Sequence, residues 1–113
     1  MTNARQGEIF WVHLDPVRGS EQAGKRPAVI ISGDTLNGAT NIRIVCALTT
    51  RIRGSTGRVT VPKIKENGLK QDSDVIVFQV RAVSVERIGK KIGKVTAGQL
   101  EAIIVSLGDL LAY

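Results

Sequence analysis

An uninterrupted apolar run, Ala28-Val29-Ile30-Ile31, begins directly after Arg26-Pro27 in this chain of 113 residues. Such a run is typical of a strand that is buried on both sides, so we expect a central strand over residues 28–32. Pro27 fixes its own φ and favours an extended conformation for Arg26, which restricts the direction of that guanidinium. The chain therefore presents a charged side chain at the margin of a core strand.

Other short segments rich in β-branched and aromatic residues lie on both sides of this run. We expect strands over residues 8–14, 42–48, 59–61 and 75–80, with Val83 and Val85 continuing the pattern. Within 42–48, one face would carry Ile42, Ile44, Cys46 and Leu48, and the other would carry Arg43. We expect connections over 33–38 and over 63–71, the second with a single helical turn at most, and a basic turn over 89–93.

The last part of the chain changes its hydrophobic period from that of a strand to that of a helix. One helical stripe is formed by Leu100, Ile103, Ile104, Leu107, Leu110 and Leu111. Thr96 and Gln99 match a capping box, so we expect the helix to begin at Thr96. The expected fold class is mainly β with a C-terminal α-helix: a small, strongly bent sheet or barrel, covered by the helix, in one domain over residues 1–113.

Composition limits the classes of protein to which the chain can belong. Hydrophobic residues make up 42% of the chain, which allows a packed interior. We find no apolar run of about 18 residues and no signal peptide at the polar N-terminus, so we expect a cytoplasmic protein that does not enter a membrane. Cys46 is the only cysteine, which leaves no internal disulfide, and its apolar neighbours indicate a small buried hydrophobe rather than a nucleophile.

The formal net charge of +6 favours a polyanionic partner, nucleic acid first, although a mere contribution to solubility is equally compatible with it. His13 is the only histidine, and its place in a strand indicates a surface residue rather than a catalyst. No spaced cluster of carboxylates is visible that would hold a metal ion. We therefore expect neither a metal nor another cofactor.

Two polar loops adjoin the expected central strands. Residues 15–26 offer Glu21, Lys25 and Arg26, and a loop of this length in a small domain is more often functional than idle. The loop after residue 48 offers Thr49, Thr50, Arg51 and Arg53. If strands 28–32 and 42–48 are antiparallel neighbours, the start of the first lies beside the end of the second. This order alone predicts that Arg26 lies close to Thr49.

The same residues resemble the MazF/PemK family of toxins from bacterial toxin–antitoxin pairs. The most specific match is Gly19-Ser20-Glu21-Gln22-Ala23-Gly24-Lys25-Arg26-Pro27 followed by the apolar strand. Gly7-Glu8-Ile9-Phe10-Trp11-Val12, Asp15-Pro16, Thr49-Thr50 and Gln79-Val80-Arg81 follow the family pattern in order. The resemblance implies an SH3-like β-barrel, a homodimer, metal-independent cleavage of single-stranded RNA at short sequences, and an antitoxin partner with an acidic, disordered tail.

The resemblance also implies the site residues. Cleavage by the 2′-OH of RNA needs a proton acceptor, positive charge on the phosphorane oxygens and a proton for the departing 5′ oxygen. Arg26 suits the phosphate oxygens, Thr49 can donate to them, and Glu21 is available either as the base or as a tether for Arg26 or Lys25. The expected RNA-binding residues are Ser20, Gln22, Lys25, Thr50, Arg51, Arg53, Gln79 and Arg81.

Some relatives carry a carboxylate where this chain has Phe78. The resemblance therefore does not extend to a polar contact at that position, nor to a preference for a particular RNA sequence. Trp11 suits either a base-stacking position or, as we expect, a core position. Two other functions compete with RNA cleavage. One is a toxin of similar fold that poisons DNA gyrase by binding, which does not need the pairing of Arg26 with Thr49. The other is a non-catalytic RNA-binding module, which leaves the segment from Glu21 to Arg26 unexplained.

Overall fold

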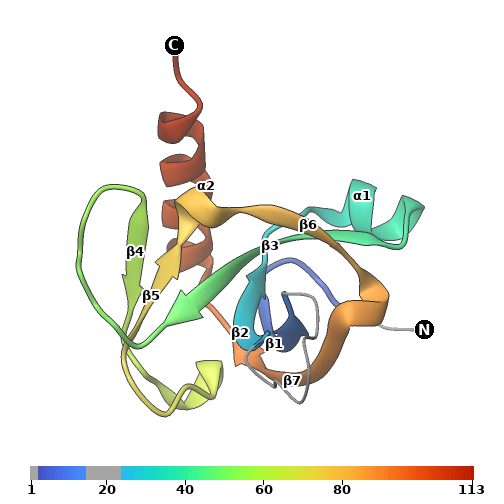
Figure 1. Cartoon of the computed structure of the whole chain (residues 1–113), viewed down its shortest axis with the longest axis horizontal. Coiled ribbons are helices and arrows are strands. Elements are labelled where there is room, and N and C mark those ends of the chain that lie inside the picture. Colours follow the sequence, from blue (N-terminus) through green and yellow to red (C-terminus); the bar gives the residue numbers. More distant parts are fainter. Residues whose placement is uncertain (1–2, 15–23) are drawn as a thin grey trace.

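Antiparallel strands and one long helix make up most of the computed structural model, which describes residues 3–14 and 24–113 (Figure 1). Its strands are β1 (Glu8–His13), β2 (Lys25–Ile30), β3 (Ile42–Thr49), β4 (Arg58–Val61), β5 (Ser73–Ile76), β6 (Arg81–Ser84) and β7 (Ile88–Lys94). Its α-helices are α1 (Asp34–Ala39) and α2 (Ala97–Leu110). Three short 3₁₀ turns are η1 (Lys65–Asn67), η2 (Val77–Gln79) and η3 (Val85–Arg87).

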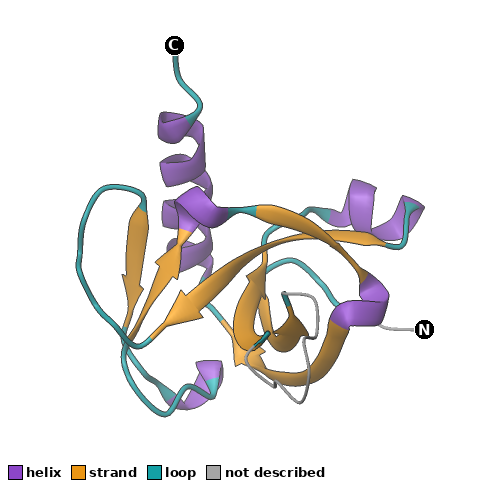
Figure 2. Cartoon of the chain, in the orientation of Figure 1, coloured by secondary structure: helices purple, strands orange, loops and turns teal. Residues whose placement is uncertain are grey.

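The strands within the described residues pair in the order β4-β5-β3-β2-β1-β7, and β6 pairs with β3 beside this path. Figure 2 shows β1, β2 and β7 curling together on one side of β3, with β4 and β5 on the other. The expected class, mainly β with a C-terminal helix, is confirmed. The pairing path does not join β7 back to β4, so the sheet is not closed and the expected barrel is not established.

The strand expected over residues 75–80 is interrupted. β5 ends at Ile76, η2 follows, and the chain then returns to β3 as β6. Thr49 lies opposite Asp74, and Val45 lies opposite Arg81. An advance of four residues along β3 therefore corresponds to an advance of seven residues from β5 to β6. The three extra residues form η2, which is displaced from the ladder. The composition of the segment could not reveal this insertion, because Val77 is buried like Val75 and Ile76 before it.

Two other expectations about the connections were wrong. Residues 89–93, expected as a turn, belong to β7, which pairs with β1, and residues 34–39 of the expected connection form α1. The basic strand is stabilised by its neighbour, since Lys91 Nζ lies 2.6 Å from Glu8 Oε2. Its glycines permit close backbone approach: a Cβ at Gly93 would lie 2.4 Å from the carbonyl carbon of Asn67.

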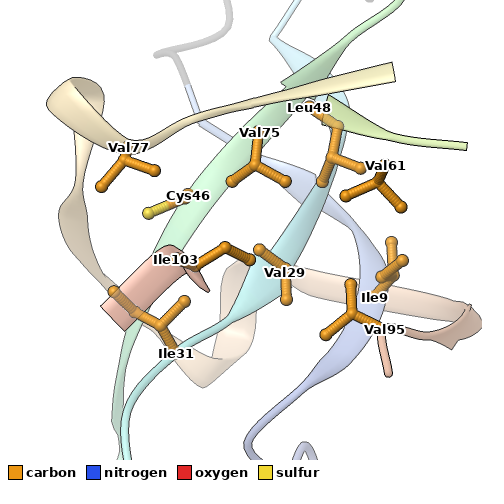
Figure 3. Packing of buried hydrophobic residues seen from close by; sticks show 10 residues of the cluster. All are labelled: Ile9, Val29, Ile31, Cys46, Leu48, Val61, Val75, Val77, Val95 and Ile103. Carbon is orange, nitrogen blue, oxygen red and sulfur yellow. The ribbon is translucent and has the colours of Figure 1, made fainter. Parts of the chain in front are cut away.

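Both faces of the central strands are buried. The first cluster is built from Ile9, Val29, Ile31, Cys46, Leu48, Val61, Val75, Val77, Val95 and Ile103, of which Figure 3 shows the packing. The second contains Phe10, Val12, Leu14, Ala28, Ile30, Val45, Ala47 and Val83 with Ala4. Burial on both faces is what the uninterrupted run after Pro27 predicted.

The start of β3 departs from the expected division of faces. Ile42 is exposed, whereas Arg43 is buried. The Arg43 side chain is accommodated because its guanidinium donates to backbone carbonyls, with Nε 3.0 Å from Ala4 O and Nη1 3.0 Å from Ile42 O. An arginine that satisfies its donors on carbonyls can enter the interior, so its charge did not identify the solvent face.

The terminal helix begins as expected. Thr96 is its N-cap: the Gln99 N–H donates to Thr96 Oγ1 at 3.1 Å, and the Thr96 N–H donates to Gln99 Oε1 at 2.9 Å. α2 packs against β4 and η2 and buries Ile103 in the first cluster. In the part of the chain that the structure describes, no helix is long and apolar enough to cross a membrane.

Candidate nucleic-acid site

A cavity of about 230 Å³ opens at the end of the second core cluster. It is lined by Leu14, Arg26, Ala47, Gln79 and Arg81. Three of these five are residues that the sequence selected, and they come from β2, η2 and β6. Leu14 and Ala47 are buried and give the cavity an apolar wall, while two guanidinium groups and one amide supply its polar side.

Arg26 lies in β2 rather than in the preceding loop, because the strand already begins at Lys25. It is exposed and stands opposite Val12 of β1. On the other side, the ladder between β2 and β3 begins at Ala28, one residue after Pro27, which has no N–H to donate. The end of β2 is therefore held by β1, while its edge toward β3 remains open at Arg26.

The register of β2 and β3 relates Arg26 to Thr49. Ala28 lies opposite Ala47, so the same register continued by two residues sets Arg26 opposite Thr49. Alternation then puts Arg26, Ala47 and Thr49 on one face of the sheet. Thr49 is half-buried, and its Oγ1 accepts a hydrogen bond from the Arg51 N–H at 3.2 Å. Its hydroxyl hydrogen is thus left to donate to another acceptor.

Arg81 joins the cavity to the end of β1. Its Nη1 donates to the carbonyl oxygen of Leu14, and Arg87 Nη1 donates to the neighbouring His13 carbonyl at 3.2 Å. The Leu14 N–H in turn donates to Gly24 O at 2.7 Å, so the two described residues on either side of 15–23 are joined by a backbone hydrogen bond. Arg81 thereby both lines the cavity and anchors Leu14 at the end of the first described segment.

Lys25 does not share the face of Arg26. It stands opposite His13, and its Nζ lies 5.7 Å from the centroid of the Trp11 ring. Trp11 is 37% exposed, so the expected core position for this residue was wrong. Strand alternation places Trp11 on the same face as the buried Ile9. Trp11 lies near the end of the sheet, however, where an exposed lysine covers its ring.

The second polar loop is held by Asp74, a residue that sequence reasoning missed. Thr50, Arg51 and Arg53 are exposed. Asp74 is fully buried, and its Oδ2 accepts from the Arg53 N–H at 2.8 Å. A carboxylate at the head of the apolar segment Val75-Ile76-Val77 was the available signal, because an aspartate enters a core only when it is well satisfied.

Three further donors satisfy the same carboxylate. The Thr60 hydroxyl donates to Oδ1 at 2.7 Å, while the Gly54 N–H and Arg58 Nη1 each donate to Oδ2 at 3.3 Å. Burial on its own raises the pKa of Asp74, but the bonds from the Arg53 N–H, the Thr60 hydroxyl, the Gly54 N–H and Arg58 outweigh it, so the pKa lies below its usual value. The ionised carboxylate therefore fixes the loop next to Thr49, its partner across the β3–β5 ladder.

Other sequence-selected residues do not enter the described site. Ser20, Glu21 and Gln22 lie outside the described residues. Cys46 is buried as expected, and burial raises its pKa to about 12, so its thiol is not an activated nucleophile. Over residues 3–14 and 24–113, no group of three His, Cys, Asp or Glu side chains is placed to hold a metal ion.

The cavity is suited to binding an anion with oxygens in several directions. Arg26 and Arg81 bring two delocalised cations to one opening, and each can donate two parallel hydrogen bonds to phosphate oxygens. Gln79 adds both a donor and an acceptor, which can read a base edge. None of the five lining residues is a carboxylate, so the cavity itself provides no competing anion.

Comparison with known proteins identifies relatives with this architecture. Residues 5–111 match the family model described as the PemK-like, MazF-like toxin of type II toxin–antitoxin systems. Endoribonuclease MazF9 of Mycobacterium tuberculosis is 36% identical over 102 residues, which cover 85% of this chain and 86% of the relative.

Solved structures share the fold as well. MazF from Deinococcus radiodurans is 28% identical, with a TM-score of 0.75 over 95% of this chain and 94% of that chain. A MazE–MazF structure from the same organism is 25% identical, with a TM-score of 0.74 over 95% and 94% of the two chains. Since the family model spans nearly all of the sequence, the chain belongs to the PemK-like, MazF-like toxins of type II toxin–antitoxin systems.

Proposed function

We propose that this toxin is a metal-independent endoribonuclease that cleaves single-stranded RNA at the cavity beside Arg26 and thereby stops translation and growth. The observation that carries the proposal is the convergence of Arg26, Gln79 and Arg81 on one cavity, on the face where the strand register directs Thr49. A relative covering 85% of this chain is named an endoribonuclease, which supports the same reaction class. Cleavage of messenger RNA would place the protein in the cytoplasm.

The proposed reaction uses the RNA as its own nucleophile. The 2′ oxygen forms a bond to the adjacent phosphorus, the bond from phosphorus to the 5′ oxygen breaks, and the products carry a 2′,3′-cyclic phosphate and a 5′-hydroxyl. Arg26 neutralises the phosphorane oxygens through paired hydrogen bonds, and the Thr49 hydroxyl donates to one of them. The proton leaves the 2′-OH and a proton reaches the 5′ oxygen, so the overall step consumes none.

For Glu21 both assignments remain part of the proposal: it is either the base that accepts the 2′-OH proton or a tether for Arg26 or Lys25. Arg26 is assigned to charge stabilisation rather than to proton transfer, because a guanidinium resists deprotonation. Lys25, Thr50, Arg51 and Arg53, with Ser20 and Gln22, are proposed to contact the RNA backbone along the rim, where cations contribute affinity without reading bases. Gln79 and Arg81 contact the nucleotides in the cavity.

Two assembly properties belong to the same proposal. The exposed apolar residues on the outside of α2 support a homodimer. The proposed fold is an SH3-like barrel, which the curling of β1, β2 and β7 in Figure 1 supports. The proposed antitoxin would be acidic and partly disordered, because the net charge of +6 and the cationic cavity suit an anionic chain that excludes RNA. A related MazF from Deinococcus radiodurans has been solved together with MazE, which supports a protein partner for this toxin.

The test is cleavage of one long single-stranded RNA by the purified protein in EDTA, with the ends of the products sequenced and chemically typed. We expect cyclic phosphate and 5′-hydroxyl ends. Arg26→Ala should reduce the rate by at least about 100-fold, since it removes the main charge at the phosphorane, without changing the circular dichroism. Arg5→Ala, which removes an exposed arginine outside the cavity, is the matched control and should cleave normally.

Retention of cleavage by Arg26→Ala, or loss of wild-type cleavage in EDTA, would refute the mechanism. Absence of cleavage together with trapped gyrase–DNA complexes would favour the gyrase-poisoning alternative. Binding of RNA without any cleavage would leave only the non-catalytic module.

A further inference from the structure

Phe78 is exposed, in contrast with the other phenylalanine of the chain. It is 51% exposed, whereas Phe10 is 7% exposed within the second core cluster. Single exposed apolar side chains are common and need no special explanation. The location of Phe78 does need one: it precedes Gln79, which lines the cavity, and both belong to the three-residue insertion that is displaced from the ladder.

The ring is held in place by the turn at Gly57. This glycine has a φ of +81°, and a Cβ added to it would lie 2.9 Å from Phe78 Cδ2, so the ring lies directly against the glycine backbone. The Val77 and Phe78 N–H groups both donate to Gly57 O, at 2.9 and 3.3 Å. Two backbone bonds and a contact that only glycine permits therefore fix where the ring stands.

A cation is also fixed near the ring. The guanidinium carbon of Arg58 lies 5.8 Å from the Phe78 centroid, and the same guanidinium donates to the buried Asp74 at 3.3 Å. A cation at this distance attracts the ring electrostatically and restricts its rotation further. The result is an aromatic ring that is half open to solvent and preorganised. It is carried by the residue before Gln79, which lines the cavity together with Arg26 and Arg81.

We propose that Phe78 stacks on an unpaired base of the RNA whose phosphate enters the cavity, and so sets the position of the nucleotide next to the cleaved bond. This inference rests on the proposed function, because it names how that site holds its substrate. Every base has a π-face, so stacking contributes affinity at this position and favours the bases that stack most strongly, while Gln79 is left to read the edge of a neighbour. The site then needs no carboxylate at position 78.

The test measures stacking separately from charge and from cleavage. The probes are single-stranded RNAs with every 2′-OH methylated, which cannot be cleaved: one with 2-aminopurine in place of each adenine, and a matched one with abasic residues. Variants are Phe78→Leu, which keeps an apolar side chain, and Phe78→Tyr, which keeps the ring. Ile64→Ala removes another exposed apolar residue, which is 39% exposed and is not one of the residues that line the cavity, and serves as the control.

We expect Phe78→Leu to weaken binding of the base-containing RNA by roughly 5- to 150-fold and to abolish part of the 2-aminopurine quenching. Binding of the abasic RNA should not change, Phe78→Tyr should restore both signals, and Ile64→Ala should match wild type. On cleavable RNA, Phe78→Leu should raise KM and alter which base is preferred beside the cut.

Equal weakening of both probes, or an unchanged affinity for the base-containing RNA, would overturn the proposal. The proposal would also be overturned if Phe78→Leu weakened the binding of an acidic antitoxin peptide but not the binding of RNA. The inference and the proposed function fail separately: a wild-type protein that binds the probe with ring-dependent quenching but never cuts RNA contradicts only the proposed function.

Discussion

Asp74 is the residue that fixes the second polar loop, and its chemistry makes a pH-dependent prediction. Asp74→Asn keeps the shape but replaces one oxygen by an N–H₂ group that faces backbone donors, so the bonds to Arg53 and Gly54 cannot all form. We expect the free energy of unfolding at pH 7 to fall by about 2 kcal/mol, because a buried charged acceptor is lost. Urea denaturation followed by circular dichroism measures it.

The sign of the pH effect follows from the lowered pKa of Asp74. The ionised carboxylate stabilises the folded state above the ordinary aspartate pKa of about 3.9, and this stabilisation is lost as the pH falls through the lower pKa of the folded state. The difference between wild type and Asp74→Asn should therefore shrink below about pH 4. Asp109→Asn, an exposed change near the end of α2, is the control; a difference that persists unchanged in acid would contradict the account.

For single residues, the sequence supported those predictions that depend only on the order of the strands along the chain. The antiparallel register of β2 and β3, which directs Arg26 and Thr49 to one face, follows from the order of two consecutive strands. Asp74 could not be found in this way, because its bond to the Arg53 N–H spans 21 residues and depends on the loop folding back over β5. Gln79 and Arg81 reach one cavity, but through a 3₁₀ turn rather than through the strand alternation that suggested it.

Among the elements, β7 shows why a basic, glycine-containing segment can be mistaken for a turn. Gly93 stands opposite Ile9, and its missing side chain lets the backbone of η1 approach. Asn67 holds η1 rigidly there, since its Nδ2 donates to Pro62 O at 2.8 Å and its Oδ1 accepts from the Leu69 N–H at 3.0 Å. The glycine reflects packing by a distant segment, which composition alone does not reveal.

A matched pair of substitutions tests this packing. Gly93→Ala would put a Cβ 2.4 Å from the Asn67 carbonyl carbon, so we expect the free energy of unfolding to fall by about 1–3 kcal/mol. A Cβ added at Gly108 in α2 would have no atom within 4 Å. Gly108→Ala should therefore raise the free energy of unfolding by about 0.5–1 kcal/mol, because alanine favours the helix more than glycine does. Thermal and urea unfolding of both variants measures whether the free energy of unfolding falls in one and rises in the other. The same change in both variants would show that β7 and η1 are not in close contact.

At the scale of the whole molecule, the apolar stripe of the terminal helix is only partly buried within a single chain. Ile103 is enclosed in the core, but Ile104 and Leu111 are 40% and 71% exposed. These two lie seven residues apart and therefore on one side of the helix, beside the buried stripe. A second copy of the chain packed against this side would remove both side chains from water. We therefore place the interface of the proposed homodimer on this side of α2.

The dimer can be tested without RNA. In light scattering after gel filtration, wild type should have twice the 12.2 kDa mass of a single chain. Leu111→Glu and Ile104→Glu should run as monomers, because each would bury a charge in the interface. Val105→Glu is the matched control: Val105 is 56% exposed but lies about 100° around the helix, so this variant should stay dimeric. A wild type at the mass of one chain, or dimeric Leu111→Glu and Ile104→Glu proteins, would assign the exposed stripe to a different partner.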